Sequence, residues 1–247
     1  MVQWIRSLTF IAACTIAMPV VGLIFAPWAL FSMRGAYACC KTYSRLVMWM
    51  AEHIVGMRCE VRGTPPEGDV LIAAKHQSFL DILMIFQAIP LGKFIMKKEI
   101  LWMPVIGQYA KRMKMYAVDR GKRGAAISKM LEDVKIGGLK AGQLIIYSQG
   151  TRVAPGVSAP YKKGTAALYE QLGQPCVPVA TNVGYFWPRR GLYRRPGVAV
   201  VEFMEPMPPG MTRDDFMAHL ELVVEARSDA LLKEAKDNAA DQGHRNA

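Results

Sequence analysis

The stretch from Leu8 to Met33 constrains this chain most. It runs for 26 residues without a charged side chain, as LTFIAACTIAMPVVGLIFAPWALFSM. A helix of about 20 apolar residues is long enough to cross the hydrocarbon core of a bilayer, so we expect this segment to lie in lipid. Pro19, Gly22 and Pro27 interrupt the run. Two arrangements remain open: a kinked helix that spans the bilayer and a helical hairpin that enters one leaflet.

The residues around this apolar run indicate whether it is cleaved as a signal peptide and how it is oriented in a membrane. Ala36-Tyr37-Ala38 has the small residues of a signal-peptide cleavage site, but the run far exceeds the apolar region of about 7–15 residues in such peptides. One cation, Arg6, precedes the run, and several follow it within 30 residues: Arg34, Lys41, Arg45, Arg58 and Arg62. The positive-inside rule therefore predicts that the body of the protein lies on the cytoplasmic face of the (inner) membrane.

A second apolar stretch, LVMWMAEHIVGM, begins at Leu46. It is too short and too polar to span a bilayer, and it is typical of an interfacial helix. We therefore interpret residues 1–56 as N-terminal membrane-anchoring helices.

Beyond Gly56, short apolar runs alternate with helical stretches, which predicts an α/β domain over residues 57–211 with a mixed β-sheet flanked by helices. Residues 212–247 are predicted to form a C-terminal helix and a tail, with the last dozen residues frayed. A basic amphipathic helix is expected over AAISKMLEDVKIGGL. The expected strands and remaining helices lie in MRCEVRG, DVLIAAK, FLDILMIFQAI, GKFIMKK, MYAVDR, QLIIYSQ, KGTAALYEQL, PCVPVATN and GVAVVEFM.

The net charge and the cysteine content limit which binding partners and which compartment the sequence is compatible with. The net charge is +11, and residues 1–211 hold 26 Lys and Arg against 12 Asp and Glu. Such a basic body fits nucleic acid, an anionic bilayer or an acidic small substrate. The cations are scattered among the strands without a recognition helix or an aromatic stacking motif, which argues against nucleic acid. Five cysteines without metal-ligand spacing indicate reduced thiols in a cytosol-facing protein and no metal site.

The segment KHQSFLDILM places His76 five residues before Asp81. DVLIAAK is expected to end as a strand at Lys75, and Ser78 and Asp81 have the spacing of a capping box for the next helix. The turn between strand and helix allows His76 to fold back, so that Asp81 orients one ring nitrogen and leaves the other as a base. A helix cap beside an incidental histidine is the alternative.

Further segments in this order give a resemblance. His76, four residues and Asp81 are followed by KKEILWMPVIG, YAVDRG, QGTR and CVPVATN. From about Val70 to Val183 the chain resembles the glycerolipid acyltransferase family, most closely the 1-acyl-glycerol-3-phosphate acyltransferases, which make phosphatidic acid. The resemblance implies an acyltransferase domain over 57–211.

The resemblance also implies residue roles. His76 would be the general base and Asp81 the residue that holds its tautomer. The acyl donor would be acyl carrier protein or a coenzyme A thioester, the acceptor the membrane lipid lysophosphatidic acid, and no cofactor or metal would be needed. Substrate-binding residues carried over by motif are Arg120, Gly150, Thr151 and Arg152, with Lys97 and Lys98 as looser candidates.

Two departures from the family pattern concern the acceptor. Gln149 stands where the family usually has glutamate, and it is expected to bind a glycerol hydroxyl or to orient Arg152. Lys114 stands where the family commonly has glycine. These departures keep a different lysolipid open as acceptor, such as a lyso-ornithine lipid. From another class, a non-enzymatic basic membrane scaffold explains the charge and the apolar run but not His76 and Asp81.

Overall fold

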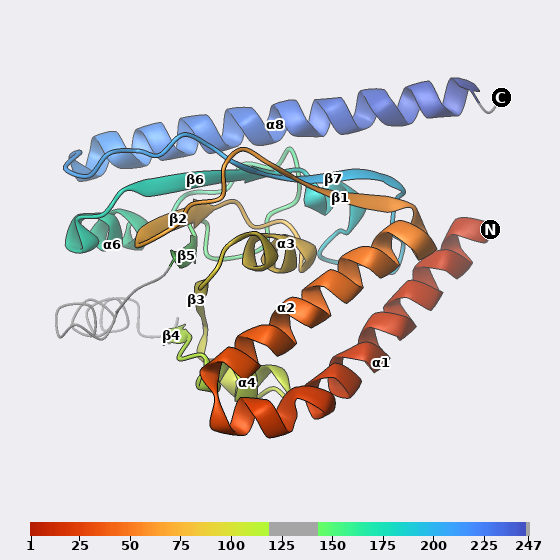
Figure 1. Cartoon of the computed structure of the whole chain (residues 1–247). Coiled ribbons are helices and arrows are strands. Elements are labelled where there is room, and N and C mark those ends of the chain that lie inside the picture. Colours follow the sequence, from red (N-terminus) through yellow and green to blue (C-terminus); the bar gives the residue numbers. More distant parts are fainter. Residues whose placement is uncertain (119–142, 246–247) are drawn as a thin grey trace.

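The structure, a computed structural model of the chain, describes residues 1–118 and 143–245. In these ranges a seven-stranded sheet has the order β1-β7-β6-β2-β5-β3-β4 and lies between helices on both faces (Figure 1), which confirms the α/β class. The strands are β1 Met57–Arg62, β2 Val70–Ala74, β3 Lys93–Lys97, β4 Tyr116–Val118, β5 Gln143–Tyr147, β6 Cys176–Thr181 and β7 Gly197–Phe203. The expected helix over AAISKMLEDVKIGGL lies outside the described residues.

Strand β2 is central and runs parallel to both neighbours, β5 and β6. Strand β3 is parallel to β5, whereas β7 is antiparallel to β6, so the sheet is mixed as predicted. All residues of β2 are buried. Ile72 and Ala74 belong to one hydrophobic core and Leu71 and Ala73 to another, because helices cover both faces of the strand.

Helices form the two outer layers. On one face α8 (Arg213–Arg245) runs along the sheet, with α6 (Gly164–Leu172) beside it; on the other lie α3 (Leu80–Ala88) and the N-terminal helices (Figure 1). Short helices complete the described chain: η1 (Ala51–Val55), η2 (Lys98–Trp102), α4 (Ile106–Arg112) and α7 (Val183–Phe186).

The expectation that the last dozen residues fray is wrong, because α8 stays helical to Arg245. Residues 233–241 are rich in Ala, Lys and Glu, which favour helix. Glu234 also accepts a bond from Arg62 of β1 at 2.7 Å, and Ala235 is buried. Helix propensity thus supports the last turns of α8, and contacts hold the helix just before them.

The apolar run forms α1 (Val2–Phe31), which continues through Pro19 and Pro27 and breaks at Ser32, where α2 (Met33–Met50) turns back beside it (Figure 1). By length and composition α1 could cross a membrane, alone among the helices of the described ranges. LVMWMAEHIVGM is not a separate helix, because it continues α2 into the π-helical turn η1.

One face of α1 packs on the domain along much of its length. The amide of Gln3 donates to the carbonyls of Val55 (3.1 Å) and Arg194 (3.0 Å). Further along, Tyr109 of α4 donates its hydroxyl to the carbonyl of Gly22 at 2.6 Å. A Cβ at Gly22 would lie 2.7 Å from the Val105 side chain, so glycine permits this close approach.

Candidate active site

His76 and Asp81 meet where β2 gives way to α3. His76 Nδ1 lies 2.9 Å from Asp81 Oδ1. Asp81 is fully buried, while the His76 side chain is 13% exposed. The turn between Ala74 and Leu80 brings these residues together, as the sequence predicts.

The surroundings of Asp81 fix the histidine tautomer. Asp81 Oδ2 accepts bonds from the backbone N–H groups of Gln77 and Ser78, each at 2.7 Å. An ionised carboxylate can only accept hydrogen bonds. His76 Nδ1 must therefore carry the proton toward Asp81, and Nε2 keeps a free lone pair.

One of the two bonds of the expected capping box forms, and α3 is two residues shorter than expected. The Asp81 carboxylate accepts from Ser78 N at 2.7 Å, whereas Ser78 Oγ accepts from Leu80 N at 3.2 Å rather than from Asp81 N. The helix itself begins at Leu80, with Phe79 as its N-cap residue. Asp81 thus both closes the helix start and orients His76.

Tyr147, the last residue of β5, supports the His76 ring. The two rings stack with centroids 4.0 Å apart and planes 19° apart, and the Phe94 ring also stacks with Tyr147, with centroids 6.1 Å apart. Burial and the nearby Asp81 carboxylate raise the pKa of Tyr147 well above its ordinary value, so the phenol stays neutral. Sequence reasoning missed Tyr147, which only its place at the end of a strand beside β2 could have indicated.

The segment after β5 lies beside His76. Because β2 and β5 are parallel neighbours, both carboxyl ends lie at one edge of the sheet, where ligands commonly bind. Val153 N donates to the carbonyl of His76 at 2.8 Å. Gly150, with φ of 70°, makes the turn that carries Thr151 and Arg152 to this edge.

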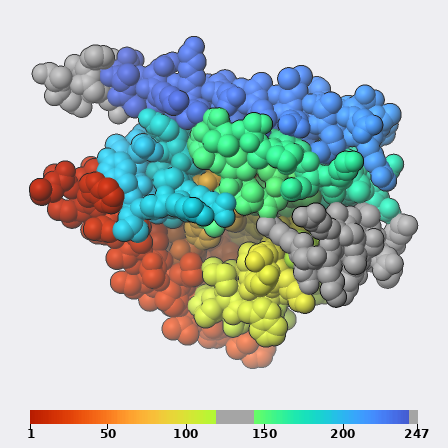
Figure 2. All heavy atoms as spheres, turned by 180° about the vertical axis from the view of Figure 1, so that it is seen from behind, coloured from red at the N-terminus to blue at the C-terminus, as the bar shows by residue number. Residues whose placement is uncertain are grey.

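Arg189 adds a second guanidinium there. Its NH1 donates to Thr151 Oγ1 (3.3 Å) and to the carbonyl of Arg152 (3.2 Å). The Arg152 guanidinium makes no hydrogen bond or ion pair with any residue that the structure describes. From behind, the loop after α7 (cyan) lies between the start of α1 (red) and the segment after β5 (green) in Figure 2. Sequence reasoning missed Arg189, because its link to Thr151 spans 38 positions.

Gln149 points away from Arg152. It is 3% exposed, and its amide donates to the carbonyl of Ala159 (3.2 Å) and to Glu225 of α8 (3.4 Å). Glu225 also pairs with Lys75, which is 1% exposed, and accepts a bond from Tyr161 at 2.8 Å. The expected partner of Gln149, Arg152, is thus replaced by a carboxylate that sequence reasoning did not single out.

The looser candidates lie at the surface or outside the described residues. Lys97 pairs with Glu99 at 3.1 Å, and both are exposed, as is Lys98. Arg120 lies outside the described residues. Lys114 has φ of 55°, a left-handed conformation that explains why the resembling family commonly has glycine there.

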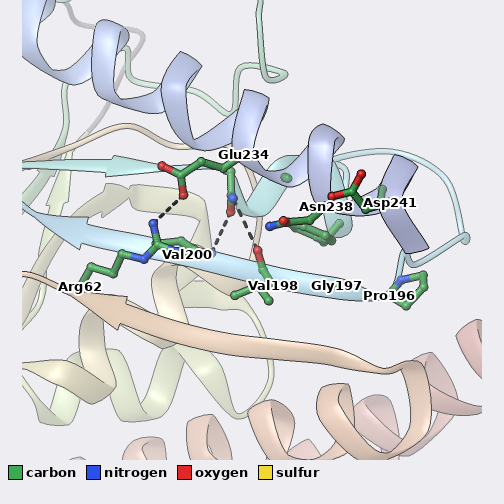
Figure 3. Close-up of a pocket in the computed structure, with 12 residues that line it drawn as sticks. Arg62, Pro196, Gly197, Val198, Val200, Glu234, Asn238 and Asp241 are labelled. Carbon is green, nitrogen blue, oxygen red and sulfur yellow. Dashed lines mark hydrogen bonds and ion pairs between the residues drawn. The ribbon is translucent and has the colours of Figure 1, made fainter. Parts of the chain in front are cut away.

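Metal-ligating side chains do not gather in the described ranges: no three of His, Cys, Asp and Glu could hold an ion together. The five cysteines are free thiols. Figure 3 shows a pocket between β7 and the end of α8, crossed by the ion pair of Arg62 and Glu234. None of the described site candidates lines this pocket, so it lies apart from His76.

Comparisons with known proteins match the part of the chain that contains His76, Asp81 and Arg152. The profile of the family described as Acyltransferase matches residues 58–182. A 1-acyl-sn-glycerol-3-phosphate acyltransferase of Pseudomonas aeruginosa is 27% identical over 81% of this chain and 79% of its own. One from Cocos nucifera is 31% identical over 83% and 70%. The crystal structure of the 1-acyl-sn-glycerophosphate acyltransferase PlsC from Thermotoga maritima shares the fold, with a TM-score of 0.75, 20% identity and coverage of 92% and 95%.

Proposed function

The chain belongs to the acyltransferase family, and we propose that it moves a fatty acyl group from a thioester to the sn-2 hydroxyl of 1-acyl-sn-glycerol 3-phosphate, giving phosphatidic acid. The observation that carries this proposal is the His76–Asp81 pair, which leaves His76 Nε2 free beside the segment that bears Arg152. The relatives from Pseudomonas aeruginosa and Cocos nucifera bear the name of this activity.

His76 acts as the general base. An alcohol is a weak nucleophile at neutral pH, and His76 Nε2 takes its proton as the oxygen attacks the thioester carbonyl. An ester C–O bond forms, the C–S bond breaks, and the proton passes from His76 to the leaving thiolate. Asp81 holds the ring in place and stabilises the imidazolium that forms between these events.

Arg152 binds the phosphate of the acceptor. Its guanidinium presents paired N–H donors whose geometry matches phosphate oxygens, and no described residue bonds to these donors. Thr151 and the backbone turn at Gly150 add donors. Arg120, Lys97 and Lys98 are further cations for the phosphate or for the donor, which is an acyl carrier protein or a coenzyme A thioester.

The N-terminal hairpin holds this site at the membrane. The outward face of α1 and α2 exposes large apolar side chains, among them Trp4, Ile5, Leu23, Ile24, Trp28, Leu30, Phe31 and Trp49. The opposite face of α1 is bound to the domain at Gln3 and at Gly22, so the domain must follow α1 wherever it lies. In a hairpin that lies in the cytoplasmic leaflet, the apolar outward face contacts lipid while the opposite face stays on the domain. A helix that spanned the bilayer would carry the attached domain into lipid.

The structure weakens the case for a lysolipid without phosphate. Of the two departures that kept it open, Gln149 is the one in the segment that bears Arg152, and Gln149 is buried against Ala159 and Glu225. A non-enzymatic scaffold gives no reason for a buried carboxylate that orients a histidine.

Purified protein in detergent, given a labelled acyl thioester and a panel of lysolipids, tests the proposal. We expect transfer to lysophosphatidic acid to exceed transfer to lysophosphatidylcholine and to lyso-ornithine lipid. Acyl carrier protein and coenzyme A thioesters in parallel identify the donor. Preferred acylation of a lipid without a phosphate monoester would overturn the acceptor, and no transfer to any lysolipid would overturn the reaction.

A further inference from the structure

A buried lysine directly precedes His76. Lys75 is 1% exposed, and its ammonium group pairs with Glu225 of α8. The backbone of Lys75 is fixed by a bond from its N–H to the carbonyl of Val179 in β6 at 3.0 Å. A buried ammonium is stable only beside a carboxylate, so the end of β2 depends on a residue 150 positions away.

The same carboxylate reaches the second active-site segment. One oxygen of Glu225 pairs with Lys75, and the other accepts bonds from Tyr161 (2.8 Å) and from the Gln149 amide (3.4 Å). Lys75 stands one residue before His76, and Gln149 stands three residues before Arg152. Glu225 therefore contacts the residues that follow β2 and β5, at the sheet edge where His76 and Arg152 lie.

Gln149 is neutral where the resembling family usually has glutamate. A glutamate at 149 would lie beside Lys75 and could pair with it, since both side chains bind one carboxylate group. In this chain the buried cluster contains Glu225 instead, so its single negative charge comes from α8 rather than from the QGTR segment. The Gln149 amide nitrogen fits a carboxylate neighbour, whereas two facing carboxylates would repel.

We infer that Glu225 is a positioning residue of the active site, which aligns His76 and Arg152 through Lys75 and Gln149 and replaces the carboxylate that Gln149 lacks. This inference rests on the proposed function for the reaction that it aligns. Burial, followed by the Glu225 charge, also raises the pKa of Tyr161, which keeps that phenol a donor to the carboxylate.

The test moves the carboxylate from position 225 to position 149. Three variants are compared with wild type: Glu225→Gln, Gln149→Glu, and the double variant Gln149→Glu/Glu225→Gln. Asp229→Asn is the control, because Asp229 lies one turn further along α8, is exposed and loses the same charge. For each, kcat and KM for lysophosphatidic acid are measured well below the melting temperature, which is measured separately.

Glu225→Gln leaves Lys75 unpaired, and Gln149→Glu places two carboxylates on one ammonium group. We expect each single variant to lose about 10- to 100-fold in kcat/KM, since small displacements of reacting groups are costly. The double variant should regain at least about tenfold over Gln149→Glu, and Asp229→Asn should match wild type.

Two results would overturn the inference while leaving the proposed function intact. In one, folded Glu225→Gln keeps wild-type kcat and KM and only melts earlier, which makes Glu225 a structural anchor of α8. In the other, the double variant is no more active than Gln149→Glu; this comparison holds even if Glu225→Gln alone does not fold. Absence of transfer by wild type would instead overturn the proposed function, and the role of Glu225 in that reaction with it.

Discussion

The two parts of the proposed active site differ in how far their polar groups are already satisfied. Asp81 is fully buried, and its two oxygens accept from His76, Gln77 and Ser78. The Thr151–Arg152 part is open: Thr151 is exposed, and the Arg152 guanidinium has no partner among the described residues. The first part is therefore organised before substrate arrives, whereas under the proposed function the second is completed by the phosphate of the acceptor.

This difference predicts which step each part controls. Groups held in place before binding act on the chemical step and should change kcat. Groups that lack a partner until the acceptor binds should change KM for that acceptor. Four substitutions test this division.

His76→Ala should have the largest effect, a loss of about 10²–10⁴ in kcat, because a positioned base is removed. The melting temperature should stay within a few degrees of wild type, since the ring lies at the edge of the core. Near-normal turnover of the folded variant would exclude His76 as the base.

Asp81→Asn should lower kcat by about 10²-fold or more, as loss of an orienting carboxylate does in other enzymes. The amide oxygen can keep the bonds from Gln77 and Ser78, which turns the amide NH2 toward His76 Nδ1. The ring proton then moves to Nε2, where the base is needed. Steady-state kinetics beside a thermal melt separate this effect from a weakened helix start. A raised KM with unchanged kcat would contradict the division.

Arg152→Lys keeps the charge and loses the paired donors, so KM for lysophosphatidic acid should rise about tenfold with a smaller change in kcat. A lysolipid without a phosphate monoester serves as the internal control, because its KM should not change. An equal rise in KM for both acceptors would show that Arg152 does not bind the phosphate.

Arg189→Ala should have the smallest effect, about two- to fivefold in KM, because its bonds to Thr151 and the Arg152 carbonyl are exposed. Arg189→Lys is the matched variant that retains the charge. If Arg189→Ala impaired KM as strongly as Arg152→Lys, both guanidinium groups would have to bind the acceptor.

Local patterns in the sequence predicted the parts of the fold and site that neighbouring residues determine. The strand at Val70, the turn at His76 and a helix that starts within two residues of Ser78 follow from apolar runs and capping residues within a few positions. Helix α8 was predicted from its apolar spacing, and it differs only in remaining helical to Arg245.

The features that the sequence did not reveal depend on pairs of residues far apart in the chain. Glu225 looks like any acidic residue on an amphipathic helix, and its link to Lys75 exists only once α8 covers the sheet. Pro19 suggested a break in α1, but the helix continues through it. The actual break comes at Ser32, whose Oγ accepts from Arg34 N at the start of α2.

The bond from Gln3 to the Arg194 carbonyl sets an order of events during synthesis. Gln3 leaves the ribosome first, and its partner follows 191 residues later. At about 5–20 residues per second this delay lasts roughly 10–40 s. During that time the inward face of α1, with Phe10 and Cys14, has no domain to pack on. The inward face of α1 therefore stays exposed during this interval unless lipid or a chaperone covers it.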